Sequence, residues 1–344
     1  MKFWRSALNR QLFIGTRFRN FLIPDYFDSL EIEPALNQLA KGKLDCEKHK
    51  VLIAALSGLQ LIDNESTELS YQYKENRSED VGSLSLRSVA QENFLTRFEI
   101  EARGIAFDNG VLDGGVKRVL NRRAFFIEIH GKGRLVFPLL ANLISSGFDN
   151  CALATRSDVN PTDINGGYLK RSDLGFDKNR KLIALKEEVS LYPEVLGSGG
   201  KPDLIISIGA SSPESLQSWL ALGIPQIFAD YENSGELRIG PFVEPRNGPC
   251  YNCLLIAESE LGFPAFNSLL NTRSQSANQS AQKSELASTL AAYGSSLIAL
   301  EVLRVADTGS SNLHQKTMLI SMLNYLEPQI TSWERSPRCG CNWS

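Results

Sequence analysis

The sequence predicts a two-part α/β protein. A small winged helix-turn-helix domain is expected over residues 1–90, and a doubly wound α/β domain with a structural zinc site over residues 91–344. Three observations predict this fold class. Short strands give way to short helices near the N-terminus. Strands alternate with helices around a glycine turn from residue 124, and four of the six cysteines form two close pairs far apart in the chain.

The N-terminal region has the element order of a small winged helix. Runs of apolar and aromatic residues predict short strands at Gln11–Gly15 and Arg17–Ile23. The apolar spacing then changes to that of a helix and predicts helices over 30–39 and 46–56. A turn or return strand is expected at 59–62. This order predicts a winged helix-turn-helix.

The second predicted helix limits what such a domain can do. A winged helix usually suggests DNA binding, but residues 47–50 read Glu-Lys-His-Lys, which is not a basic recognition face. A dimerisation or packing module is one alternative. A peptide-binding wing, which adds a strand to an exposed sheet edge, is another, with a pocket expected around Val51, Leu52 and Ala55.

An α/β pattern follows the polar stretch 63–83, which places a domain boundary near 75–90. Strands are predicted at 124–130, 151–155, 204–208 and 225–229, and helices at 139–144 and 214–222. Alternating strands and helices are typical of a doubly wound sheet.

A glycine turn, Gly131-Lys-Gly133, follows the first of these strands. Such a turn at a helix N-terminus commonly binds phosphate. However, Val136 stands where a nucleotide-binding turn has its third glycine, and no acidic residue ends the next strand. A nucleotide site and a glycine turn kept only for its backbone geometry both remain open.

The two cysteine pairs predict a metal site. Cys250 and Cys253 form a C-x2-C pair, and Cys339 and Cys341 form a C-x-C pair near the C-terminus. Four thiolates suit one tetrahedral Zn²⁺, and four protein ligands leave no open position, so the zinc would be structural. Ordinary buried thiols or two disulfides are the alternatives, but the other two cysteines are isolated in the sequence.

The C-terminal third contains three further predicted features. Residues 271–289 are rich in Asn, Ser and Gln and suggest a flexible loop. The following helix, 286–305, is apolar on a broad face and is expected to pack at a dimer interface. Segments 318–323 and 329–333 are predicted to be strands that lead to the last cysteine pair.

Composition excludes several classes of function. The net charge is −3 and the pI about 5.8, so bulk charge favours neither nucleic acid nor an anionic membrane. The sequence shows no signal peptide and no apolar run of about 18 residues. Cysteines without a secretion signal are typical of the reducing cytoplasm, where we place the protein.

Several motifs occur in the order found in ThiF-like enzymes, which are relatives of the ubiquitin-activating enzymes. They are Gly131-x-Gly133-Arg134, Asp158–Asp163, Arg171–Lys178, Gly240–Val243, and the two cysteine pairs. The chain most resembles the leader-binding cyclodehydratase partner protein of thiazole/oxazole-modified microcin biosynthesis. The resemblance implies a winged-helix domain that recognises a precursor peptide, followed by a ThiF-like domain.

The chain departs from adenylating members of this group at two positions. The resemblance expects an aspartate for the ATP ribose where Thr155 stands, and an aspartate for Mg²⁺-ATP near Ser211. A hydroxyl supplies no negative charge for magnesium, which prefers carboxylate oxygens. Arg171 and Lys178 are kept, but packing or surface ion pairs would explain them equally well.

The resemblance therefore implies a non-catalytic scaffold subunit, to which no catalytic residue is assigned. It would bind the leader of a ribosomal precursor peptide and present the core to a YcaO-type cyclodehydratase, with a flavin dehydrogenase and a homodimer also expected. An ATP-dependent ThiF-like enzyme that activates a precursor carboxylate in peptide antibiotic biosynthesis is the alternative. A nucleotide-dependent oxidoreductase fits least well.

Overall fold

In the computed structural model, the described residues are 2–5, 12–15, 20–23, 29–40, 43, 45, 47–58, 97–102, 104–105, 115–164, 167–190, 200–209, 212–231, 235–261 and 285–343. They form two compact units, Met1–Val119 and Leu120–Ser344, and each is described by itself. The domain boundary predicted near 75–90, the turn at 59–62 and most of the loop at 271–289 lie outside the described residues.

The first unit contains a three-stranded antiparallel sheet and two longer helices. The strands, in the order β1-β2-β3, are β1 (Lys2–Arg5), β2 (Leu12–Gly15) and β3 (Asn20–Ile23). The helices are α1 (Ser29–Ala40) and α2 (Lys50–Gly58). The two predicted strands and two predicted helices are present, with β1 in addition. Their assignment to a winged helix-turn-helix stays a prediction.

The predicted pocket residues of α2 do not share one environment. Leu52 is buried and Ala55 is half-buried, whereas 67% of Val51 is exposed. Leu52 and Leu56, one turn apart, therefore belong to the packed face of the helix, and Val51 belongs to its open face.

The second unit is built on a seven-stranded mixed sheet in the order β10-β9-β8-β7-β6-β4-β5. Its strands are β4 (Ile127–Gly131), β5 (Cys151–Leu153), β6 (Leu204–Ile208), β7 (Gln226–Tyr231), β8 (Leu237–Val243), β9 (Lys316–Ile320) and β10 (Gln329–Ser332). Neighbours among β5, β4, β6 and β7 are parallel, and β8, β9 and β10 extend the sheet in antiparallel fashion.

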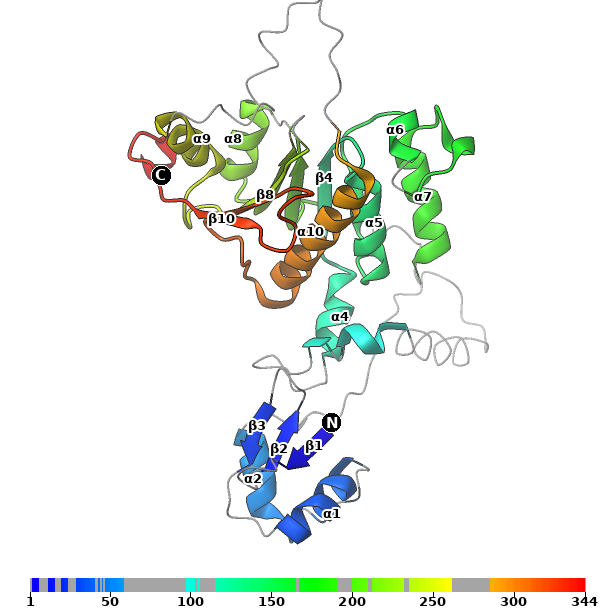
Figure 1. The fold of residues 1–344 in the computed structure, drawn as a ribbon, viewed down its shortest axis with the longest axis vertical. Coiled ribbons are helices and arrows are strands. Elements are labelled where there is room, and N and C mark those ends of the chain that lie inside the picture. Colours follow the sequence, from blue (N-terminus) through cyan, green and yellow to red (C-terminus); the bar gives the residue numbers. More distant parts are fainter. Residues whose placement is uncertain are drawn as a thin grey trace, which may run out of the picture. The chain divides into compact units, whose positions relative to one another are not determined.

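Helices cover both faces of this sheet (Figure 1). The helices of this unit are α5 (Val136–Ser145), α6 (Pro161–Ile164), α7 (Lys178–Val189), α8 (Pro213–Ala221), α9 (Tyr251–Glu260) and α10 (Ser288–Thr308), with short 3₁₀ turns at Arg171–Asp173 and Gly340–Trp343. Helix α4 (Val116–Arg122) spans the boundary between the two units. The main core joins α5 and α10 to one face, through fully buried side chains such as Leu139, Leu143 and Ile298. On the other face, α8 and α9 pack around Phe228 and Trp333.

The doubly wound prediction holds for the four parallel strands and is incomplete for the other three. Strand β8 was not predicted because Arg238, Gly240 and Pro241 interrupt its apolar residues. The strand predicted at 318–323 ends at Ile320, and a turn that exposes Leu323 and Leu326 follows it.

Helix α10 is long and apolar enough to cross a membrane by length and composition. Its apolar residues instead pack against α5 and the sheet, with Leu290, Ile298 and Val302 buried. A helix in the core of a protein can be as long and apolar as a membrane-spanning helix. Burial against α5 and the sheet therefore explains the apolar composition of α10. The predicted dimer interface on this helix stays a prediction.

Candidate functional site

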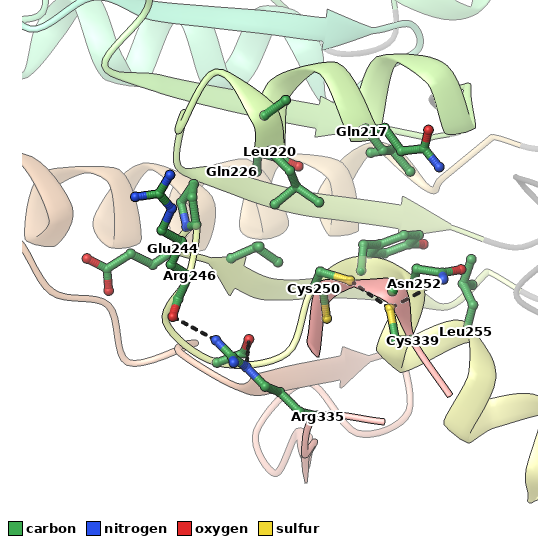
Figure 2. Close-up of a pocket in the computed structure, with 18 residues that line it drawn as sticks. Gln217, Leu220, Gln226, Glu244, Arg246, Cys250, Asn252, Leu255, Arg335 and Cys339 are labelled. Carbon is green, nitrogen blue, oxygen red and sulfur yellow. Dashed lines mark hydrogen bonds between the residues drawn. The ribbon is translucent and has the colours of Figure 1, made fainter. Parts of the chain in front are cut away.

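The four predicted metal ligands come together at one end of the second unit (Figure 2). Cys250 precedes the first turn of α9 and Cys253 lies within it, while Cys339 and Cys341 come from the C-terminal segment. The four sulfur atoms all lie within 4.8 Å of one another. Individual Sγ–Sγ distances are 3.8 Å for Cys250–Cys253, 3.5 Å for Cys250–Cys339 and 3.3 Å for Cys253–Cys341.

These distances decide between the alternatives for the cysteines. A disulfide needs an S–S distance of about 2.05 Å, so the four thiols are free. A tetrahedral site with Zn–S bonds of about 2.3 Å places its sulfur atoms about 3.8 Å apart, which the cluster nearly matches. The structure therefore brings together four ligands that could hold a metal ion. The identity of that ion is part of the proposal below.

The thiols differ in how readily they ionise. Burial, followed by hydrogen bonds with Cys253 and Cys339, raises the pKa of Cys341 to about 11. Burial also acts to raise the pKa of Cys339, but hydrogen bonds from the Cys341 backbone and the Asn252 amide outweigh it and lower this pKa to about 7. Of these two thiols, Cys339 more readily becomes a thiolate, the form that binds metal.

The glycine turn predicted for phosphate contains a carboxylate of the chain itself. Glu285 accepts a hydrogen bond at 3.2 Å from the backbone N–H of Arg134, just before α5 begins. A Cβ built on Gly133 would lie 3.0 Å and 3.1 Å from the two Glu285 carboxylate oxygens, and 2.5 Å from the Tyr231 hydroxyl. The negatively charged group at the N-terminus of α5 is therefore a side chain of the protein itself, the Glu285 carboxylate.

Glu285 also accepts a hydrogen bond from the backbone N–H of Leu286 at 3.2 Å. The Arg134 side chain holds this segment by donating to the backbone oxygens of Leu286, at 2.7 Å, and Thr162, at 2.9 Å. Burial raises the pKa of Tyr231 above its ordinary value, and the nearby Glu285 charge raises it further. The protonated Tyr231 hydroxyl donates to the backbone oxygen of Lys132 at 3.4 Å, so Tyr231 and Arg134 both hold the backbone near the turn.

Thr155 follows β5 and supports the same turn. Its hydroxyl oxygen accepts a hydrogen bond at 2.9 Å from the backbone N–H of Gly131. A threonine here therefore has a structural partner, and no carboxylate occupies the position where the resemblance expects the ribose-binding aspartate. Ser211, the other departure, lies outside the described residues.

Lys178 is a buried ion-pair partner. Its ammonium group lies 2.9 Å from one carboxylate oxygen of Asp163 and 3.0 Å from the other, and the side chains of both residues are 2% exposed. Asp163 also accepts a hydrogen bond from the backbone N–H of Asn160 at 2.9 Å. Of the two cations kept from the resemblance, Lys178 is therefore fixed inside the protein, while Arg171 is exposed on a 3₁₀ turn.

Solved structures resemble this chain over nearly its whole length. E. coli MccB with MccA has a TM-score of 0.60 and 16% identity, covering 100% of this chain and 97% of that one. PaaA has a TM-score of 0.58 and 15% identity, covering 97% and 98%. E. coli MccB with ATP has a TM-score of 0.52 and 17% identity, covering 78% and 83%.

The chain has the fold of MccB. MccB is described as a microcin C7 biosynthetic enzyme. At these identities the likeness shows the fold alone, and in that respect it supports the ThiF-like resemblance, but not the particular cyclodehydratase partner. No protein-family model and no curated protein matches the sequence.

Sequence reasoning found the cysteine cluster and missed Glu285. The four cysteines share a residue type and a pairing pattern that are visible in one dimension. Glu285 lies at the end of a polar stretch that was interpreted as a loop, and it contacts a backbone N–H 151 positions earlier in the chain. Within the sequence, no motif links these two positions.

Proposed function

We propose that this chain binds a ribosomally made precursor peptide during the biosynthesis of a peptide antibiotic. The supporting observation is the likeness to MccB in complex with MccA, which extends over all of this chain and includes the first unit. The part of the chain that precedes the sheet of the second unit is thus shared with a protein that binds a short peptide.

Of the two versions of this function, the geometry favours a scaffold that does not adenylate. The observation that carries this version is the Glu285 carboxylate, which occupies the glycine turn where a phosphate would bind. A second negative charge at this position would be repelled. Two further observations support the scaffold version. Lys178 is buried in an ion pair with Asp163, and Thr155 has a hydroxyl group where the resemblance expects a carboxylate.

In this version the chemistry belongs to a partner. The proposed partner is a YcaO-type cyclodehydratase, followed by a flavin dehydrogenase if the azoline rings are oxidised. A leader held by this chain would raise the effective concentration of the core residues at the partner's active site. We propose that the chain acts as a homodimer within this complex.

The second version is an ATP-using enzyme that activates a carboxylate of the precursor. It is favoured by the likeness to MccB with ATP, and the comparisons with solved structures support it more directly than they support the scaffold. In this version ATP would have to displace Glu285 from the turn, and neither Thr155 nor Lys178 would contribute a free charge.

ATP–pyrophosphate exchange by the purified chain, with and without a precursor peptide, separates the two versions. The scaffold version predicts no exchange above the background of a heat-inactivated sample. Steady exchange that depends on the precursor would establish the enzyme version instead. Because the exchange assay needs no partner, its outcome is independent of the proposed cyclodehydratase.

For the cysteine cluster we propose a structural Zn²⁺ bound by Cys250, Cys253, Cys339 and Cys341. Zinc prefers four sulfur ligands in a closed tetrahedral site, and this site offers four thiols and no fifth position. Because the ligands come from two segments far apart in the sequence, a bound ion would tie the C-terminus to α9.

For the first unit we propose leader binding by strand addition. Strands β1 and β3 are the two edges of its antiparallel sheet among the described strands. An edge strand presents backbone N–H and C=O groups that an extended peptide can pair with, while side chains nearby select the sequence.

A further inference from the structure

A pocket lies beside the cysteine cluster, and Cys250, Cys339 and Cys341 form part of its wall. Its volume is 560 Å³, and it is lined by residues of α8, the turn after β8, α9 and the C-terminal segment (Figure 2). Gln226, at the start of β7, and Val243, at the end of β8, lie in its wall. Strands β4, β6 and β7 are parallel, and the glycine turn follows the last residue of β4, Gly131. Gln226 is the first residue of β7, so the pocket lies at the opposite end of these strands from the glycine turn.

The pocket combines an apolar wall with two arginines. Leu216, Leu220 and Leu255 supply apolar surface from α8 and α9, and Arg246 and Arg335 line the same cavity. Glu244 also lines it, and its carboxylate accepts a hydrogen bond from the Asn247 amide at 2.7 Å. Within the described part of the chain, the side chain of Arg246 has no ion-pair partner. Small-molecule sites commonly have this volume and this mixture of apolar surface with a few polar groups.

Arg246 stands at an unusual backbone position. The turn Glu244–Asn247 is closed by a hydrogen bond from the Asn247 N–H to the Glu244 oxygen at 3.0 Å, with Pro245 second and Arg246 third. The φ of Arg246 is 69°, a value that favours glycine at the third position of a Pro-containing turn. Arg246 is exposed and lines the cavity, and an unfavourable backbone at such a charged residue suggests a role for it.

Arg335 fixes this turn from the other side. Its guanidinium donates to the backbone oxygens of Gly248, at 2.8 Å, and Arg246, at 2.7 Å (Figure 2). These two bonds hold the Arg335 guanidinium and the backbone of the turn together, so Arg335 and the backbone that carries Arg246 are in place before any ligand arrives. Preorganised donors lose little conformational freedom on binding.

We propose that this pocket binds a small apolar carboxylate, with the carboxylate at Arg246 and the apolar body along Leu216, Leu220 and Leu255. Figure 2 places Arg246 on the side of the pocket away from Cys250 and Cys339. Thiolates bound to a metal would carry negative charge and repel an anion. An anion in the pocket would therefore bind most favourably at Arg246. A peptide C-terminus and an acyl chain share this chemistry.

Isothermal titration calorimetry on the full-length, metal-loaded chain tests the proposal with two matched pairs of probes. N-acetyl-leucyl-leucine and its C-terminal amide represent a peptide, and octanoate and octanamide represent an acyl chain. We expect at least one acid to bind saturably, about tenfold more tightly than its amide. The acid that binds more tightly identifies the source of the ligand. Equal binding of acid and amide, or no saturable binding of either acid at millimolar concentration, would overturn the proposal.

Arg246→Gly is the decisive variant because glycine suits the φ of this turn position and removes the whole side chain with its guanidinium. We expect its unfolding midpoint in urea to be unchanged or higher, and its affinity for the acid to fall about tenfold to the level of the amide. Arg338→Gln is the matched control, since Arg338 is exposed, pairs with Glu260 and does not line the pocket. Undiminished acid binding by Arg246→Gly, or an equal loss in Arg338→Gln, would refute the assignment.

Discussion

Replacing Lys178 with methionine tests whether this lysine is a structural ion-pair partner. Methionine has a similar length and removes only the charge, so the substitution leaves the Asp163 carboxylate buried without its cation. Both side chains are 2% exposed, and one hydrogen bond to Asp163, from the Asn160 N–H, remains. Breaking a buried ion pair by removing one partner costs about 3–5 kcal/mol.

The expected loss is large relative to the stability of a domain of this size. At about 2–4 °C per kcal/mol for domains of 150–250 residues, it corresponds to a fall of roughly 6–20 °C in the unfolding temperature. Urea unfolding followed by tryptophan fluorescence measures it, because Trp219 and Trp333 are both buried in the second unit.

Lys181→Met, on the same helix, is the matched control. Lys181 pairs with Asp173 at 2.6 Å, but 27% of its side chain is exposed, so its loss should cost no more than about 1 kcal/mol. The Lys181 side-chain hydrogen bond, followed by the Lys170 backbone N–H, lowers the pKa of Asp173. This contribution is therefore present above the ordinary carboxylate pKa of about 3.9 and is lost as the pH falls below it.

The outcome that contradicts this reasoning is a Lys178→Met protein as stable as the Lys181→Met control. It would mean that Asp163 does not depend on Lys178, and that the lysine is available for another role. If the same variant also abolished ATP–pyrophosphate exchange, Lys178 would be a nucleotide-binding residue and the enzyme version of the function would be correct.

Four further predictions concern the metal, the glycine turn and the peptide. Metal analysis should find about one Zn²⁺ per chain, and Cys339→Ser should lose it and lower stability; less than about half an equivalent in the unaltered chain would contradict the site. Zinc affinity should fall as pH falls, by about tenfold per pH unit for each thiol proton that the metal displaces, as a chelator competition measures. Glu285→Gln should gain affinity for inorganic pyrophosphate over the unaltered chain. Equal affinity would show that the carboxylate does not block the turn. A precursor leader peptide should bind the full chain with a micromolar Kd, about −8 kcal/mol, and 91–344 should not bind it; retained binding there would refute leader recognition by the N-terminal part.

The cysteine site and the parallel strands could be predicted because their signals are local. The C-x2-C and C-x-C motifs each place two thiols close together along the chain. Together they supply the four sulfur ligands of a tetrahedral metal site. The runs around Leu204 and Ile227 are apolar on consecutive residues, which is the pattern of strands buried on both faces. Strand β8 could not be found this way, because Gly240 and Pro241 interrupt its apolar pattern.

By itself the sequence determined the alternation of strands and helices in the second unit, the two cysteine pairs, and the hydroxyl residues Thr155 and Ser211 where the resemblance expects aspartates. Only the tertiary structure decided which groups lie in the glycine turn and beside Lys178. Glu285 reaches the glycine turn because the segment before α10 packs beside the N-terminus of α5. Lys178 is buried because α7 brings it against Asp163. Such contacts join residues whose spacing carries no periodic signal, since charge pairing depends on the position of each side chain in space and not on its local pattern.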